Sequence, residues 1–387
     1  MNRQHDSLEA GYIVFAGSVV AAATGMNYSI LPVLLESVAN HFHLDPRQIG
    51  WLGSDYLGGV AAGGLTSILW INRIRWGVFS AGCLLTLAAG MIVAYLLGPS
   101  LPALAVTFVI GLAAGAAYSI AIAAIAATPM PQKGFAVMLG VELGSGTVML
   151  WVLRPWIIEA WGALGAVLVI SAICAISAGA CIWLPYGGVQ QRQTGGGGAA
   201  ASSAVRCAPW IGVVALTIHI GFFTGLWVFL EKIGLDRAMS GVSTSRVLTG
   251  AMAVATTLAL IASRLGGKVS LVVPLSFAML AQSAGAVTLM LRQDVPGFLV
   301  GALLIVGPFA FALSYQLALV AVSDTTGKAA AFSGGVQLIG VAVGPFLMGS
   351  MIEGHGYPPA YVTFLAATLS CLAAFVYVAR HARLPSQ

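Results

Sequence analysis

Charged side chains are the scarcest component of this 387-residue sequence. Only 7% of its residues are Asp, Glu, Lys or Arg, against roughly 25% in an average soluble protein. Hydrophobic residues make up 59% of the chain, and its mean hydropathy is +0.95. A water-soluble domain cannot hide that much apolar surface, so the composition excludes a soluble globular protein. It predicts a chain that crosses a membrane several times.

The sequence also lacks the motifs of enzymes and metal sites. The run Gly195–Gly198 is not followed by Gly-Lys-Ser/Thr, so it is no phosphate-binding loop. There is no His-Glu-x-x-His and no nucleophile elbow, and the five scattered cysteines have no metal or disulfide spacing. We therefore expect no enzyme, no cofactor and no metal. The net charge of +5 lies mostly in loops, which indicates membrane topology rather than nucleic-acid binding.

The apolar segments are continuous rather than alternating, which predicts helices and not barrel strands. The first, starting near Gly11, is too long for a removable signal peptide and lacks a cleavage site. The predicted fold class is an all-α polytopic membrane protein with twelve transmembrane helices. Their expected bounds are 11–40, 48–71, 75–97, 101–128, 133–158, 163–185, 209–232, 241–263, 268–291, 296–322, 328–352 and 358–379.

A Gly/Ala/Ser-rich segment, 186–208, divides these helices into six and six. Its composition is typical of a flexible linker. The predicted domains are therefore a first bundle over 1–185 and a second bundle over 209–387. With both termini in the cytoplasm, eleven Lys and Arg residues lie on the cytoplasmic side and six on the other. This bias predicts that orientation, in the inner (plasma) membrane of the cell.

The two halves repeat each other. Spans two and eight align at a shift of 191 residues, and spans five and eleven at a shift of 195. In the second alignment Gly140 meets Gly335, and Glu142 meets Gln337. Two parallel repeats predict a pseudo-two-fold axis along the membrane normal.

Six spans plus six, joined by a central cytoplasmic linker, resemble the major facilitator superfamily over essentially the whole chain. The loop signature of that family is recognisable after span eight, where it uses Arg264, Gly266 and Lys268. A reduced copy after span two keeps Arg73, and its acidic position is Asn72. The resemblance implies a secondary transporter that works by alternating access. It also implies that spans 1, 4, 7 and 10 line a cavity and that spans 3, 6, 9 and 12 face lipid.

Polar and ionisable side chains, which are energetically costly in a membrane, avoid the spans that the resemblance places against lipid. Spans 3, 6, 9 and 12 hold no ionisable residue in their interiors, and Gln282 is their one large polar side chain. Glu36 and Glu231 match each other at helix ends, where we expect them to be solvated. The predicted cavity-wall and substrate-binding residues are Asn27, Tyr28, Tyr118, Arg154, Arg246, Tyr315, Gln316 and Gln337.

Glu142 is the strongest candidate for function. It lies about ten residues into its span, roughly 15 Å from the helix end at 1.5 Å per residue, which is the midplane. A carboxylate at that depth costs at least about 2.5–3.5 kcal/mol, and desolvation favours its neutral acid. Glu142 can therefore carry a proton. The alternative is a structural hydrogen bond between helices, which Gln337 would supply in the second repeat.

Four further residues have two interpretations each. Asp55 is either a second protonation site or half of an outer gate, and Arg246 occupies its place in the other repeat. Arg246 either pairs with that acid or binds a substrate carboxylate. Arg154 either reaches the lipid headgroups or binds substrate. His219 either relays protons or is a packed core histidine.

These observations predict a monomeric, proton-coupled transporter of a small organic solute. Two arginines on cavity-side helices favour an organic anion such as a carboxylate. The alternatives are a drug–proton antiporter that exports lipophilic cations, and a membrane receptor or assembly factor that does not transport. We expect a small-molecule substrate, protons and lipid as the partners, and no nucleic acid.

Overall fold

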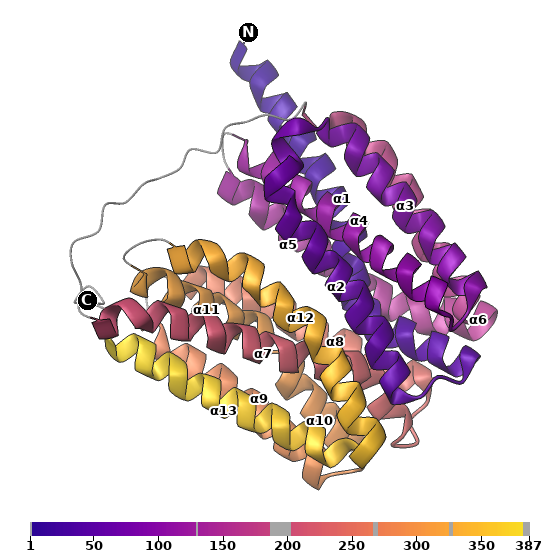
Figure 1. Ribbon diagram of the computed structural model, residues 1–387, viewed down its shortest axis with the longest axis vertical. Coiled ribbons are helices and arrows are strands. Elements are labelled where there is room, and N and C mark those ends of the chain that lie inside the picture. The colour runs from indigo at the N-terminus through magenta and orange to yellow at the C-terminus, as the bar shows by residue number, and fades with distance from the viewer. Residues whose placement is uncertain (1, 129–130, 186–202, 266–269, 325–327, 382–387) are drawn as a thin grey trace. The chain divides into compact units, whose positions relative to one another are not determined.

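The computed structural model describes residues 2–128, 131–185, 203–265, 270–324 and 328–381 (Figure 1). Every element in these ranges is a helix. The first half contains α1 (Asn2–Phe42), α2 (Pro46–Trp70), α3 (Trp76–Leu97), α4 (Leu101–Ala126), α5 (Pro131–Val152) and α6 (Glu159–Ser177). Three short helices join or extend them: the 3-10 helices η1 (Ile71–Arg73) and η3 (Ala178–Trp183), and the π-helix η2 (Leu153–Ile158). The second half contains α7 (Ser203–Leu235), α8 (Gly241–Leu265), α9 (Val272–Leu291), α10 (Val295–Val306), α11 (Phe309–Ser323), α12 (Lys328–His355) and α13 (Tyr357–His381).

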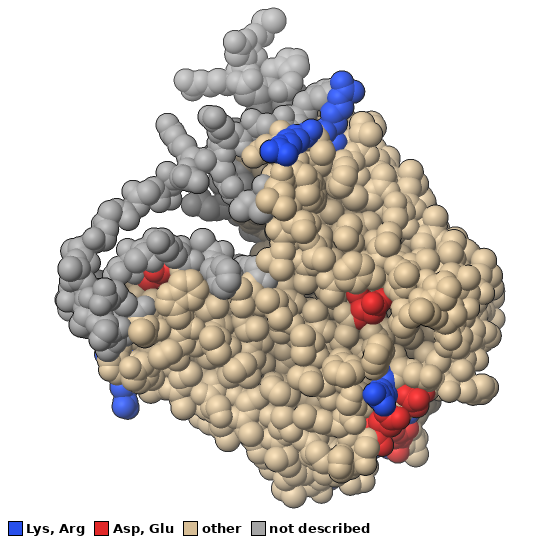
Figure 2. All heavy atoms as spheres, in the orientation of Figure 1, with Lys and Arg blue, Asp and Glu red and all other residues tan. Residues whose placement is uncertain are grey.

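Ten helical stretches of the described residues are long and apolar enough to cross a membrane. One of them, Val137–Trp183, is 47 residues long and contains a sharp break at Gly162, whose φ of 63° and ψ of −163° are not helical. The all-helical membrane fold class is therefore confirmed. Figure 2 agrees with this, because most of the visible described surface carries no charged side chain.

The segment 296–322, predicted as one span, is two helices. The chain breaks between α10 and α11 at Gly307 and Pro308. Proline has no backbone N–H and its ring crowds the preceding turn, so it interrupts the ladder of hydrogen bonds. The stretch Val295–Ser323 as a whole is long and apolar enough to cross a membrane once, as the predicted span requires, and the break at Gly307 and Pro308 is an addition to that prediction.

The described chain divides into two compact units. Unit 1 comprises Met1–Leu44 and Asp55–Gln191, and unit 2 comprises Asp45–Ser54 and Arg192–Gln387. Most of the predicted linker, 186–202, lies outside the described residues, and α7 begins at Ser203, within the remainder of it. The domain limits at 185 and 209 stay a prediction.

In unit 1, small side chains let helices touch backbone to backbone. A Cβ placed on Gly111 of α4 would lie 2.0 Å from the carbonyl oxygen of Tyr56, and one on Gly115 would lie 2.1 Å from that of Val60. Both acceptors are on α2. Alanine and isoleucine side chains from α1 and α4 fill the adjacent core, including Ala117, with none of its surface exposed.

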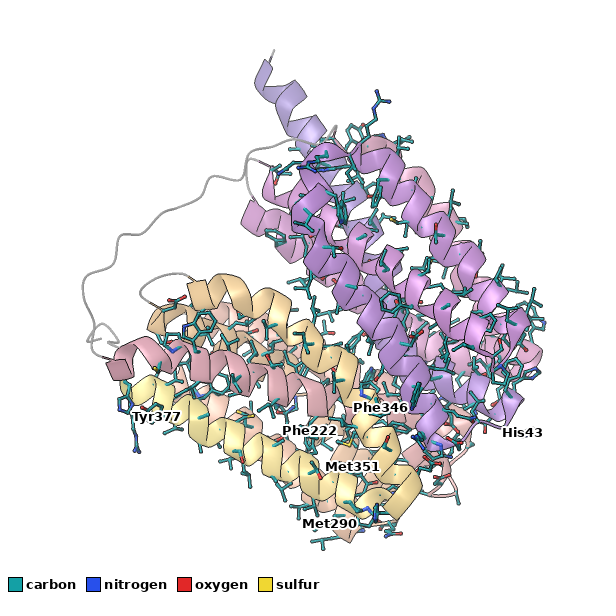
Figure 3. The ribbon with its side chains drawn as sticks, viewed as in Figure 1. His43, Phe222, Met290, Phe346, Met351 and Tyr377 are labelled. Atoms are coloured by element: carbon teal, nitrogen blue, oxygen red, sulfur yellow. The ribbon has the colours of Figure 1, made fainter. Side chains whose placement is uncertain are left out.

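Unit 2 has close backbone contacts of the same kind between α7 and α12. A Cβ on Gly344 would lie 1.9 Å from the carbonyl oxygen of Gly221, and one on Gly340 would lie 2.2 Å from that of Thr217. The beginning of α2 also belongs to this unit. The backbone N–H of Phe346, labelled in Figure 3, donates to Ser54 Oγ at 2.8 Å just after Pro345 in α12.

Candidate functional site

Glu142 lies where three helices of unit 1 meet. The hydroxyl of Tyr118, on α4, donates to Glu142 Oε2 at 3.0 Å. On the other side a Cβ built on Gly25 of α1 would lie 2.2 Å from Glu142 Oε1 and 2.6 Å from its Cδ. The carboxylate therefore rests directly on the α1 backbone, and only glycine leaves room for it. No ion pair among the described residues involves Glu142.

The local sequence explains why Glu142 fits between Tyr118 and the backbone at Gly25, a position that we call its seat. Residues four apart lie on the same face of a helix, so Gly25 and Ser29 share a face of α1, and Glu142 and Gly146 share a face of α5. These faces interlock, because a Cβ on Gly146 would lie 2.5 Å from Ser29 Oγ. Each helix thus places a glycine opposite a polar side chain of the other.

In the second repeat the corresponding helices, α7 and α12, pack together through different contacts. Between α7 and α12 the close contacts are those of Gly340 and Gly344 with the α7 backbone. Gln337, which matches Glu142, is half-buried on α12 and has a polar contact. Unit 1 thus holds a titratable carboxylate at a helix seam where unit 2 has an amide and a glycine contact.

His219 is the centre of a buried polar network in unit 2. Gln282 Nε2 donates to the carbonyl oxygen of Ile305 at 3.0 Å, so its Oε1 is the acceptor that faces His219 Nε2 at 2.9 Å. On the other side Gln316 Nε2 lies 2.9 Å from His219 Nδ1. The arrangement satisfies a neutral ring with its proton on Nε2. Among the two interpretations of His219, the geometry favours a packed histidine, and its part in proton relay stays a prediction.

This network also explains why Gln282 is the one large polar side chain in the spans that were expected to face lipid. Gln282, on α9, has none of its surface exposed. It points into unit 2 and supplies a donor to Ile305, two residues before the break at Gly307. A buried carbonyl near a helix break needs such a partner, because an unsatisfied polar group at membrane depth costs several kcal/mol.

Asp55 and Arg246 lie in different units. Asp55 is half-buried on α2, and its Oδ2 has no hydrogen-bond partner among the described residues. Arg246 is exposed on α8. Whether these two residues form a gate or bind substrate stays a prediction.

Arg154 has a partner that sequence reasoning did not consider. It lies in the π-helix η2, with 11% of its side chain exposed, and its Nε is 3.7 Å from Glu159 Oε1. A single-turn π-helix inside a longer helix is often found at functional sites. The ion pair occupies part of the guanidinium, which weakens the argument that Arg154 is available to a substrate.

The predicted cavity-wall residues differ in their surroundings. Asn27 is buried, and its Nδ2 donates to the carbonyl oxygen of Ala23 at 3.0 Å, within α1. Tyr28 and Tyr118 are half-buried, and Tyr28 has a side-chain or backbone interaction of its own. Tyr315 is 4% exposed and belongs to the hydrophobic core of unit 2, beside the buried Gln316. Their roles as a substrate wall stay predictions.

Two acids that sequence reasoning placed in solvent are buried. Glu36 is 4% exposed and accepts a hydrogen bond from Asn40 Nδ2 at 3.3 Å, and Glu231 is 0% exposed. The expectation that they are solvated was wrong. The signal was present, since the two acids match between the repeats and lie within α1 and α7 rather than beyond them. Gly25 was also missed, because a glycine gives no polar signal.

The loop signature is only partly described. Arg73 ends η1 and is exposed. The backbone of Arg264 lies in the last turn of α8, whereas Gly266 and Lys268 lie outside the described residues. No group of His, Cys, Asp or Glu among the described residues could hold a metal ion.

Two helical units with repeated packing, each with polar groups buried at membrane depth, define the class of secondary membrane transporters. The chain belongs to the Major Facilitator Superfamily, whose family model matches residues 17–338. It is a secondary transporter and not an enzyme. No curated protein matches the sequence.

Solved structures of this family share the fold at low sequence identity. A mutant form of the nucleoside transporter NupG is 13% identical with a TM-score of 0.76, over 95% of this chain and 99% of that one. The D-xylose-proton symporter is 16% identical with a TM-score of 0.73, over 94% and 96%. The human organic anion transporter MFSD10 (TETRAN) is 16% identical with a TM-score of 0.62, over 96% and 99%. Such identities show the fold alone.

Proposed function

We propose that the protein couples proton movement to the transport of a small organic solute, with Glu142 as the proton carrier. The observation that carries this proposal is the seat of Glu142, between the Tyr118 hydroxyl and the backbone at Gly25, without a cation in ion-pair distance among the described residues. A carboxylate without a cationic partner at membrane depth becomes neutral by taking up a proton.

Protonation changes what this seat can do. The ionised carboxylate only accepts hydrogen bonds, and Tyr118 supplies one. The protonated acid can still accept this bond, but it also has an O–H that needs an acceptor, which the ionised form does not. Neutralisation also removes a charge whose movement through the membrane field is worth about 2.3 kcal/mol per 100 mV. These two changes support the proposal that proton binding and helix movement are linked at Glu142.

The substrate we propose first is an organic anion. Arg246 is exposed on α8, and an arginine binds carboxylates through two parallel hydrogen bonds. The organic anion transporter MFSD10 shares the fold, which is compatible with this class. The protein would work as a monomer in the inner (plasma) membrane, with both termini in the cytoplasm.

One observation favours a second candidate, the export of lipophilic cations. The side chain of Arg154 lies against Glu159, so its charge is already balanced by an acid of the same unit. Unit 1 also holds the carboxylates of Glu142, on α5, and Asp55, on α2, and neither is in an ion pair among the described residues. Carboxylates in an apolar setting attract organic cations. The substrate screen below separates the two classes.

The test is transport by the purified protein in liposomes under an imposed pH gradient, with labelled carboxylates and cationic dyes as candidate solutes. We expect one class to move with the gradient and Glu142→Gln to abolish the coupling. Glu353→Gln, at an exposed glutamate near the end of α12, is the matched control and should transport normally.

Gradient-driven uptake that survives Glu142→Gln would overturn the role of Glu142. A protein that moves no solute with any gradient, and that tolerates Glu142→Gln without any effect, would instead support a receptor or assembly factor. If cationic dyes move and carboxylates do not, the second candidate replaces the first.

A further inference from the structure

A groove of about 530 Å³ runs along unit 1 between the start of α3 and η3. Its length is lined by apolar side chains, and Val78 (70% exposed) and Ile182 (76% exposed) are open to the surroundings. Both lie in stretches that are apolar enough to span the membrane. The volume falls within the range of about 300–1,000 Å³ typical of small-molecule sites, and the exposed apolar lining is suited to contact with lipid.

Small residues explain why the groove exists. A Cβ on Gly77 would lie 2.6 Å from the carbonyl oxygen of Cys181, so α3 and η3 touch at this point. Farther along α3 the next lining glycine, Gly82, has no atom within 4 Å of its Cβ position. The two elements therefore meet at one end and leave an open channel beyond it.

Positive charge lies at the closed end of the groove. Arg75 lines it, is exposed, is the N-cap residue of α3, and has a further interaction of its own within the chain. Arg73 is exposed at the end of η1, which is held to α3 by the bond from Trp76 Nε1 to the carbonyl oxygen of Ile71 at 2.7 Å. Figure 2 shows basic side chains gathered at this end of unit 1. The positive end of the α3 dipole adds to their field.

We infer that this groove binds one anionic phospholipid, with its phosphate at Arg75 and an acyl chain along α3 and η3. The apolar channel excludes a free phosphate as the main occupant, because phosphate makes no favourable contact with hydrocarbon side chains. Arginine suits a phosphate diester through two parallel hydrogen bonds. Basic pockets between helices at a membrane surface bind acidic headgroups in this way.

Unit 2 contains a groove of similar size whose described lining lacks the positive charge. It lies between α7 and α13, has a volume of about 570 Å³, and is lined by Trp210, Val214, Ile218 and Ala374 among others, with no Lys or Arg among its described lining residues. A groove of similar size that lacks a basic residue should accept an acyl chain without preference for its headgroup. The preference for an anionic lipid therefore depends on Arg75.

The experiment reconstitutes the protein in vesicles of equal parts phosphatidylglycerol and phosphatidylcholine, extracts it in mild detergent, and counts retained lipids by native mass spectrometry. We expect wild type to retain one phosphatidylglycerol in preference to phosphatidylcholine by about fivefold, from one charged contact near the membrane surface. Arg75→Gln should reduce this preference to the composition of the vesicle. An unchanged preference in Arg75→Gln would overturn the assignment.

A second pair of variants tests the acyl-chain part of the groove. Gly82→Leu places a side chain in the channel and should reduce the retention of both lipids. Gly179→Leu is the control, since its Cβ position is equally open but Gly179 does not line the groove. If Gly82→Leu retains as much phosphatidylglycerol as wild type, the lipid lies elsewhere and the inference is wrong. Equal loss in Gly179→Leu would likewise refute it.

Discussion

Gly25→Ala is the sharpest test of the seat that holds Glu142. The new Cβ would lie 2.2 Å from Glu142 Oε1, 2.6 Å from Cδ and 2.8 Å from Cγ. An ordinary contact needs 3.4 Å or more, so the carboxylate must retreat by roughly 1 Å. The bond from Tyr118, now 3.0 Å long, cannot follow because Tyr118 is fixed on α4.

Gly25→Ala should affect the stability of the protein and its transport activity to different degrees. The clash is with the end of a flexible side chain, so the cost in stability should be near the lower limit for overpacking, about 1 kcal/mol. A displacement of about 1 Å at a group that takes part in the reaction can cost on the order of 100-fold in rate, so proton-driven uptake should fall by more than about tenfold. Gly25→Ala should therefore reduce proton-driven uptake strongly while it reduces the thermal stability of the protein only slightly.

Uptake into liposomes under a pH gradient measures the effect on transport, and thermal unfolding in detergent measures the effect on stability. Gly140→Ala is the control, because its Cβ position on α5 has no atom within 4 Å. In a Glu142→Ala background, Gly25→Ala should cost less stability than in wild type, since the clashing atoms are gone. Full uptake by Gly25→Ala, or an equal stability cost in both backgrounds, would refute the proposed seat.

Three further predictions test other parts of the structure. Tyr118→Phe removes only the hydroxyl, and we expect the pH profile of uptake to shift while the unfolding temperature changes little. Gly344→Ala places a Cβ 1.9 Å from the Gly221 carbonyl oxygen, a backbone atom that cannot turn aside, so it should destabilise the protein by about 1–3 kcal/mol or more in thermal unfolding. Asp294 caps α10 by accepting from the N–H of Gly297, and Arg292 holds the pKa of its carboxyl at about 2. A lowered pKa gives stability that is present above about pH 4 and is lost toward about pH 2. The difference in unfolding temperature between wild type and Asp294→Ala should therefore stay constant from about pH 7 to about pH 5 and shrink below about pH 4.

Hydropathy was enough to predict the helices, because continuous apolar segments have one stable form in lipid. It could not predict where a helix breaks. The interval 296–322 is apolar on both sides of the break, and only Gly307 and Pro308 mark the division of α10 from α11. The start of α7 at Ser203 was also missed, because a Gly/Ala/Ser composition was taken as linker up to 208.

Only part of the candidate site could be predicted from the sequence, namely Glu142 and not its contacts with the residues around it. Glu142 is visible because a carboxylate in an apolar run is costly. Its neighbours are not, since Gly25 contributes only space and Tyr118 lies 24 residues away on another helix. The partner of Arg154 was missed because Glu159 lies beyond the predicted end of its span. Contacts of this kind depend on packing that the sequence pattern does not encode.

The hydrogen bonds around His219 have a mechanical consequence. They join α7, α9, α10 and α11 through side chains whose geometry allows little sliding, since Gln282 contacts the ring on one side and the Ile305 carbonyl on the other. A satisfied buried network fixes the register of the helices that share it. We therefore expect unit 2 to move as a rigid body, and the flexing that accompanies each transport cycle to be concentrated in unit 1, which holds the proposed proton carrier Glu142.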